Sequence, residues 1–162
     1  FSEAFLVLRA SERGVSATWI PAVLMVMSVV YTLSSYPAGK LSDAMPRRRV
    51  LAWGMAVLLL ADVLLAKANG IGWLFAGIAL WGLHMGLTQG ILASLVADTA
   101  PAEFRGTAVG AFNLVSGAAL LAASALAGWL WQAHGPAATF WCGAAISAIS
   151  LPLVVLMARK DR

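Results

Sequence analysis

One short stretch decides the fold of this chain: Gly39-Lys40-Leu41-Ser42-Asp43-Ala44-Met45-Pro46-Arg47-Arg48-Arg49. It is densely charged, and it lies between two long apolar runs. No charged residue occurs from residue 17 to residue 39, and none from residue 50 to residue 61. A run of about 20 apolar residues is long enough to cross a bilayer. The sequence therefore places the charged stretch at a membrane–water boundary.

The composition of the whole chain also indicates a membrane protein. Hydrophobic residues make up 61% of the 162 residues and charged residues only 11%, whereas a soluble domain carries about 25% charged residues. So few charges argue against the alternative, a very apolar soluble bundle. The net charge of +4 does not indicate a nucleic-acid partner, because the basic residues lie at the ends of apolar runs. The single cysteine, Cys142, excludes an intramolecular disulfide, and we predict no metal site and no cofactor.

The apolar runs predict an all-α integral membrane protein with one partial and five full spanning helices. Their expected ranges are 1–10 for the partial helix, then 17–38, 50–66, 71–97, 105–131 and 137–158. The chain begins at Phe1, without an initiator methionine, inside what resembles the end of a helix. We therefore expect further sequence upstream.

The basic residues predict the orientation of these helices. One set of alternating helix ends carries eight of them: Lys40, Arg47, Arg48, Arg49, Arg105, Arg159, Lys160 and Arg162. The opposite ends carry three, which are Arg9, Arg13 and Lys67. Because short basic loops stay in the cytoplasm, we expect the 39–49 stretch, the 98–105 turn and the C-terminus on the cytoplasmic side of a bacterial inner membrane.

The opening stretch resembles the cytoplasmic signature of the major facilitator superfamily. That pattern has a Gly, a Leu and an Asp at alternate positions, followed by basic residues, and five residues match it in register: Gly39, Leu41, Asp43, Arg47 and Arg48. Two positions depart, since Ala44 replaces the usual Arg and Pro46 the usual Gly. The departures resemble the second copy of the signature, between spans eight and nine.

A second segment, residues 97–108, is similar to the connection between spans ten and eleven in many bacterial members. Together the two matches imply that the chain is the C-terminal half of a twelve-span transporter, from a truncated span seven to span twelve. In that family each half is a six-helix bundle built from inverted repeats, and substrate binds between the halves. The resemblance thus implies three partners: an N-terminal six-helix half, the lipid bilayer and a small-molecule substrate. It also implies that this loop, which includes Gly39, gates the transporter: Asp43 would bond nearby helix N-termini or basic residues, and Arg47 and Arg48 would join cytoplasmic ion pairs. The three arginines would at the same time hold the loop inside.

Four residues of the fourth predicted helix share one face. Trp81, His84, Met85 and Thr88 follow i, i+3, i+4, i+7 spacing. The resemblance directs such a face toward the substrate cavity, so Trp81, His84 and Thr88 are candidates to line it. His84 lies near the middle of the span and would bind substrate or carry a proton. A hydrogen-bonded packing histidine is the alternative.

The other side of the same helix carries Gly82, Gly86 and Gly90, each four residues apart. Small residues at this spacing let helix backbones approach closely. We predict that they serve helix packing, and sliding of one helix on another is a compatible role.

Two further polar stripes contain candidates for the cavity, Tyr31 in the second helix and Asn113 in the fifth. Both stripes are too polar to face lipid. They face either another helix or an aqueous cavity.

Two carboxylates fall within apolar segments. Glu3 is a candidate for proton coupling, although it could instead pair with Arg9 or with the other half of the transporter. Asp62 lies in the third predicted helix, which is peripheral in the family. We expect it to pair with Lys67 near the outer surface by snorkelling.

These observations favour a secondary active transporter that moves a small solute by alternating access, with proton coupling as one option. An enzyme is not predicted, because the two histidines, His84 and His134, lie in different regions and no nucleophile motif is present. A membrane scaffold or sensor that has the same fold but does not transport is the remaining alternative.

Overall fold

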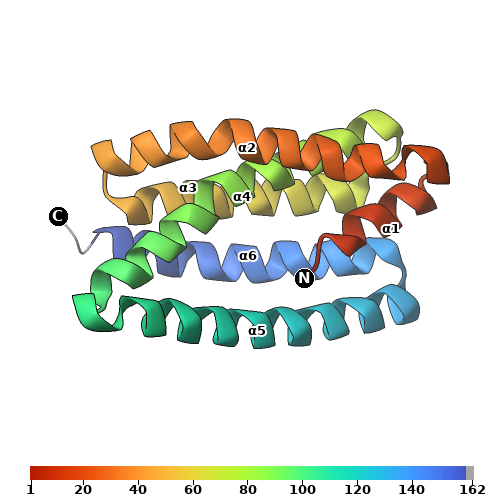
Figure 1. Ribbon diagram of the computed structural model, residues 1–162. Coiled ribbons are helices and arrows are strands. Elements are labelled where there is room, and N and C mark those ends of the chain that lie inside the picture. Colours follow the sequence, from red (N-terminus) through yellow and green to blue (C-terminus); the bar gives the residue numbers. More distant parts are fainter. Residues whose placement is uncertain (160–162) are drawn as a thin grey trace.

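The computed structural model describes residues 1–159, and within that range it is built from helices alone (Figure 1). The longer elements are α1 (Ala4–Glu12), α2 (Ile20–Ala44), α3 (Arg47–Lys67), α4 (Ile71–Thr99), α5 (Arg105–His134) and α6 (Pro136–Arg159). Two short 3-10 turns, Ala17–Trp19 and Ala102–Phe104, precede α2 and α5. The all-α prediction is confirmed. Lys160 and Arg162, which the charge count includes, lie outside the described residues.

Five of the helical segments are long and apolar enough to cross a membrane. They are Ala17–Ala44, Arg47–Lys67, Ile71–Thr99, Ala102–His134 and Pro136–Leu156. At 1.5 Å per residue, even the 21 residues of α3 extend about 30 Å, which matches the hydrocarbon core of a bilayer. With nine residues, α1 is too short to span, as expected for the partial first helix.

The charged stretch differs from its predicted form. We expected the second helix to end at residue 38 and the third to begin at residue 50, but α2 continues to Ala44 and α3 starts at Arg47. Met45 is extended (φ −144°, ψ 163°) and Pro46 is the N-cap of α3. A residue before proline avoids helical geometry, so Pro46 confines the break to these two residues. The signature is therefore mostly helical, and only its Met45–Pro46 step is a connection.

The helix α4 organises the bundle. It runs obliquely between its neighbours and packs along both α2 and α3, while α3 also packs along α6 (Figure 1). In contrast, α5 contacts both α6 and α4 only sparsely. Ala127 is the one residue of α5 that is buried. This uneven packing leaves space between α5 and the rest of the bundle.

Arg9 joins α1 to the end of α3. Its side chain is only 1% exposed, its Nε donates to the carbonyl oxygen of Leu65 at 2.9 Å, and its Nη2 donates to that of Ala66 at 2.9 Å. Carbonyls in the last turn of a helix lack intrahelical partners and carry partial negative charge, so a guanidinium there satisfies both needs. Glu12 neutralises Arg9 through an ion pair with Nη1 at 2.5 Å. Glu3, the pairing alternative considered for Arg9, is not its partner.

Candidate functional site

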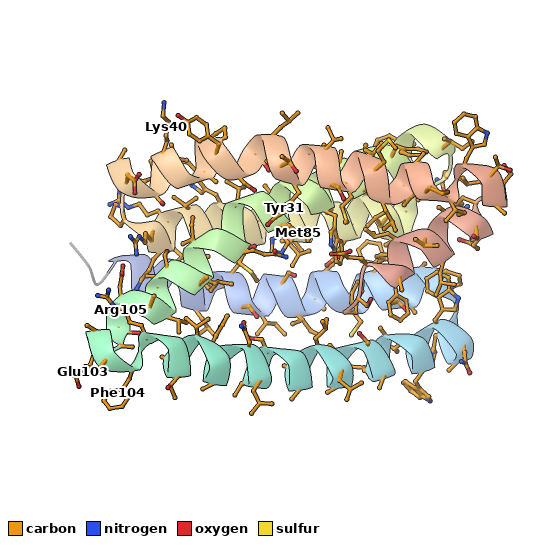
Figure 2. The ribbon with its side chains drawn as sticks, in the orientation of Figure 1. Tyr31, Lys40, Met85, Glu103, Phe104 and Arg105 are labelled. Atoms are coloured by element: carbon orange, nitrogen blue, oxygen red, sulfur yellow. The ribbon has the colours of Figure 1, made fainter. Side chains whose placement is uncertain are left out.

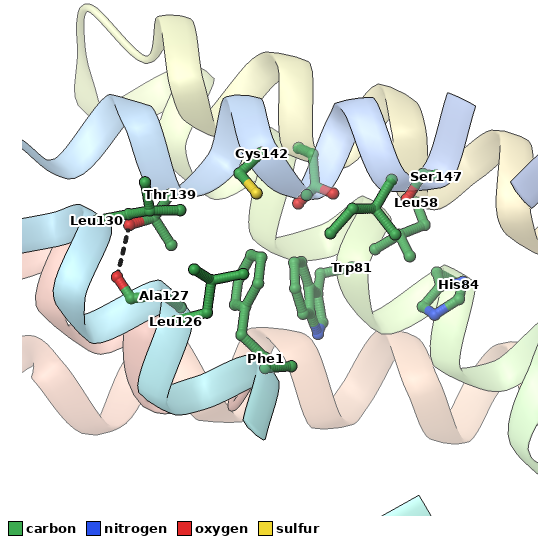
Figure 3. Close-up of a pocket in the computed structure, with 14 residues that line it drawn as sticks. Phe1, Leu58, Trp81, His84, Leu126, Ala127, Leu130, Thr139, Cys142 and Ser147 are labelled. Carbon is green, nitrogen blue, oxygen red and sulfur yellow. Dashed lines mark hydrogen bonds between the residues drawn. The ribbon is translucent and has the colours of Figure 1, made fainter. Parts of the chain in front are cut away.

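A cavity of about 260 Å³ lies where α5 stands away from the bundle (Figure 3). We call it the inner cavity. Its walls come from α3, α4, α5 and α6, together with Phe1, and most of its lining is apolar. The lining residues are Phe1, Leu58, Asp62, Trp81, His84, Ala123, Leu126, Ala127, Leu130, Thr139, Cys142, Gly143, Ile146 and Ser147. Two of the residues predicted to line a substrate cavity, Trp81 and His84, are among them.

The prediction that Asp62 pairs with Lys67 near the outer surface is wrong. It is 1% exposed, it lines the inner cavity, and its Oδ1 has no hydrogen-bond partner among the described residues. Lys67, its expected partner, instead places its ammonium group 5.9 Å from the centre of the Trp141 ring. The reason is the direction of α3: Asp62 lies on the side that also carries Leu58 and Leu65, which packs into the bundle.

Gly143 explains how the Asp62 carboxylate fits between α3 and α6. A Cβ atom at Gly143 would lie 2.7 Å from Asp62 Oδ2 and 2.8 Å from a ring carbon of Phe1. Any larger residue at position 143 would displace both groups. The carboxylate therefore occupies space that α6 leaves open at this one position.

His84 is held by the backbone of α3. Its Nδ1 lies 2.9 Å from the carbonyl oxygen of Gly54. Since a carbonyl oxygen only accepts hydrogen bonds, Nδ1 carries the hydrogen, and a neutral His84 then has its free lone pair on Nε2. The packing role and the cavity role that we considered for His84 are thus compatible, because one ring nitrogen serves each.

Aromatic rings form one wall of the inner cavity. The Phe1 ring lies 5.2 Å from the Trp81 ring and 5.7 Å from the Phe140 ring, centre to centre. Trp81 and Phe140 are both buried. Next to this wall, the Thr139 hydroxyl donates to the Ala127 carbonyl oxygen at 3.0 Å and links α6 to α5 (Figure 3). The rings and this hydrogen bond fix the shape of the cavity.

Tyr31 lies at a different place, in a second and more polar cavity of about 320 Å³ between α2 and α4. We call it the α2–α4 groove. Figure 2 shows Tyr31 and Met85 in the middle of the bundle, and Lys40 and Arg105 toward one end of it. Three signature residues, Gly39, Asp43 and Arg47, line the same groove. The structure thus brings Tyr31 beside the signature and not beside His84.

The two segments that resemble the family are joined by an ion pair. Arg47, at the first position of α3, hydrogen-bonds and pairs with Asp98 in the last turn of α4. A cation at a helix N-terminus and an anion at a C-terminus each oppose the helix macrodipole, so each offsets the other's unfavourable position. Asp43 is exposed and makes no ion pair or hydrogen bond within the described range. Arg48 lies beside Arg47 in the first turn of α3.

The glycines of α4 have different surroundings along the helix. A Cβ atom at Gly82 would collide with the backbone of Met27, and one at Gly86 with the side chain of Ser34. Both glycines therefore lie where α4 closely approaches α2, as a packing role requires. Gly90 is different, because nothing lies within 4 Å of its Cβ position and it lines the α2–α4 groove. The described residues therefore give Gly90 no close packing contact of this kind.

Three other candidates lie outside the inner cavity as the structure defines it. Thr88 is buried with its methyl group against Gly54 of α3, and its hydroxyl donates to the His84 carbonyl oxygen at 2.8 Å. Asn113 is exposed on α5, and Glu3 is exposed at the N-cap of α1. No group of three or more metal-ligating side chains occurs in the described part of the chain.

Comparison with known proteins gives one family for nearly the whole chain. The family model described as Major Facilitator Superfamily matches residues 4–162. An uncharacterized MFS-type transporter of Methanocaldococcus jannaschii is 33% identical over 156 residues, which is 93% of this chain and 39% of that protein. A probable 4-methylmuconolactone transporter of Cupriavidus pinatubonensis is 30% identical over 94% of this chain and 34% of that protein. The inner membrane transport protein YajR of Escherichia coli is 24% identical over 68% of this chain and 24% of its own length. The chain therefore spans between about a quarter and two fifths of the length of these relatives, and no solved structure matches it.

Proposed function

Because the chain belongs to the major facilitator superfamily, we propose that it works as one six-helix half of a membrane transporter. It is a multi-pass membrane protein and not an enzyme. The activity that we propose is movement of a small solute by alternating access, together with an N-terminal six-helix half. The observation that carries the proposal is the inner cavity, which lies inside a bundle of spanning helices. An acidic side chain, Asp62, and a basic one, His84, both line it. Ionisable side chains within a membrane are costly and usually mark a transport pathway.

The proposed location is a bacterial cytoplasmic membrane, with the C-terminus in the cytoplasm. One relative is named as an inner membrane protein. The excess of basic residues at the ends that carry Lys40 and Arg105 favours the cytoplasm for those ends. The pair of Arg47 and Asp98 belongs to the same end, where it would hold α3 and α4 together in one access state.

Proton coupling is a finer part of the proposal. His84 has the better position, because it lines the inner cavity and leaves Nε2 free for a proton or a substrate group. Glu3 remains a candidate only through contacts with the other half, since it is exposed in this structure.

A transport assay tests the proposal. The full-length transporter would be reconstituted in proteoliposomes with an imposed pH gradient, and uptake of three labelled probes would be followed: 4-methylmuconolactone, benzyltrimethylammonium and glucose. We expect gradient-dependent accumulation or expulsion of at least one probe. His84→Ala should reduce the rate at equal protein content in the membrane, and Glu3→Gln should do so only if the other half uses it. If none of the three probes moves, the result would favour the scaffold or sensor with the same fold.

The signature needs its own comparison. Asp43→Asn should slow transport while leaving membrane insertion intact. The matched control is Glu103→Gln, which neutralises another exposed carboxylate of the same membrane side. If both variants transport at the rate of the unmodified protein, the signature of this chain only sets topology.

A further inference from the structure

We propose that the inner cavity binds a small organic cation, an ammonium group on an apolar body, with Asp62 as the residue that recognises the charge. The inference rests on the proposed function, because it names the class of substrate for the same cavity. It depends on the position of Asp62, which nothing in the family match or in the names of the relatives assigns.

Asp62 makes no ion pair with a basic side chain of the described residues. Its Oδ1 is fully buried without a hydrogen bond among the described residues. Arg9 is committed to Glu12 and to two carbonyls of α3, and Lys67 lies over Trp141. A buried carboxylate that is neither paired nor hydrogen-bonded is strongly unfavourable. The site is therefore arranged to receive a positive charge.

A positive group can reach Asp62 from the cavity. The carboxylate lies in the cavity wall, with Oδ2 toward Gly143. A ligand that carries both an ammonium group and a ring would place its charge at Asp62 and its ring near Trp81, since both residues line the cavity.

The rest of the lining limits the kind of cation that fits. Trp81 offers a ring that attracts cations through its face, and Ser147 offers a hydroxyl on α6. The remaining lining is mostly apolar and suits a hydrocarbon body. At about 260 Å³ the cavity falls just below the range for drug-sized ligands, about 300–1,000 Å³. These features select a small amine over a large one, and the carboxylate selects against anions.

Binding can be measured without transport. The full-length transporter in lipid nanodiscs would be titrated with benzyltrimethylammonium in an isothermal calorimeter, with neopentylbenzene as the uncharged molecule of the same shape. We expect saturable binding of the cation alone. Asp62→Asn keeps the size of the side chain and removes its charge, and it should weaken binding about tenfold or more. Glu103→Gln removes an exposed carboxylate elsewhere and should leave the affinity unchanged.

A second variant protects the test against misfolding of the first. Gly143→Ala adds a methyl group 2.7 Å from Asp62 Oδ2, so the carboxylate must move and cation affinity should fall by about threefold or more. Equal affinity of Asp62→Asn and the unmodified protein would overturn the proposal. So would a change confined to the pH dependence of solute transport, which would make Asp62 a proton carrier only. If Asp62→Asn does not fold, undiminished binding by Gly143→Ala overturns it instead. Transport of the lactone without binding of the cation would refute this inference and leave the proposed function standing.

Discussion

Replacing Gly82 by alanine should loosen the contact between α2 and α4, whereas the same change at Gly90 should not. At Gly82 the new Cβ would lie 3.1 Å from the carbonyl carbon of Met27 and 3.3 Å from its Cα, with the carbonyl oxygen closer still. Carbon atoms prefer separations of about 3.5–4.0 Å. Because the colliding atoms are backbone, α2 itself must withdraw. Overpacking of this kind costs about 1–3 kcal/mol.

Gly90→Ala is the matched control, because no atom lies within 4 Å of its Cβ position. Both substitutions occur inside the same helix, so both gain the helix propensity of alanine, about 0.8–1 kcal/mol. That gain cancels in the difference, and the free energies of unfolding of the two variants should differ by about 1–3 kcal/mol. Gly86→Ala should fall between them, since its nearest neighbour, the Ser34 hydroxyl, belongs to a side chain that can rotate.

The assay is reversible unfolding in mixed micelles with increasing dodecyl sulfate, followed by tryptophan fluorescence and helical circular dichroism. An order of stability with Gly82→Ala lowest and Gly90→Ala highest is expected. Equal stabilities for the variants at positions 82 and 90 would refute the close approach of α2 and α4. A less stable Gly90→Ala would mean that the groove beside it is closed by something the described residues do not include.

Three other predictions test single contacts. A double-mutant cycle of Arg47→Gln and Asp98→Asn should give a coupling energy of about 0.2–1 kcal/mol, because the two side chains are 31% and 58% exposed. The coupling should shrink with added salt, and a larger coupling that does not depend on salt would contradict an exposed pair. Thr139→Val removes the hydrogen bond to Ala127, so it should lower the free energy of unfolding by about 0.6–1.7 kcal/mol and speed amide exchange in α5 more than in α3; uniform exchange would show that this bond does not hold α5. Nitrogen-15 spectra of His84 should show the hydrogen on Nδ1 in the neutral ring, because a carbonyl oxygen accepts there; a neutral ring with its hydrogen on Nε2 would rule that bond out.

The order and number of helices could be predicted from the sequence because apolar length is a local property. Any run of about 20 apolar residues satisfies the membrane requirement, whatever it packs against. Helix ends beyond the membrane are different. Residues 40–44 include the charged Lys40 and Asp43, and hydropathy ends the helix before them. They remain helical because water satisfies polar side chains on a helix as well as in a loop. There the end depends on Pro46, through its effect on Met45.

The site could be predicted only in part, because a residue's direction depends on its neighbours. Asp62 was expected to face outward, since Lys67 is five residues away. The sequence did carry a contrary signal, because Asp62 shares a stripe with Leu58, four residues before it, and with Leu65 and Ala66, three and four residues after it. Small or branched apolar residues in such a stripe mark a packed helix face. That stripe outweighs one lysine, because a side chain can snorkel only from a face that is already exposed.

The geometry of α4 explains why Thr88 and Gly90 have surroundings that their spacing did not predict. Trp81 and Thr88 are seven residues apart and point in nearly the same direction, whereas Gly82 and Gly90, eight residues apart, point about 80° away from each other. Spacing fixes that direction around the helix axis, but it does not state what lies there. Because α4 crosses its neighbours obliquely, two residues on one face meet different surroundings at different depths. Trp81 thus reaches the inner cavity while Thr88 meets Gly54 of α3. Gly90 differs from Gly82 in direction as well as in depth, so Gly82 touches α2 while Gly90 faces open space. Spacing does not give the position and angle of the neighbouring helix. Because that helix crosses α4 at an angle, one polar stripe can form part of a site at one depth and a packing contact at the next.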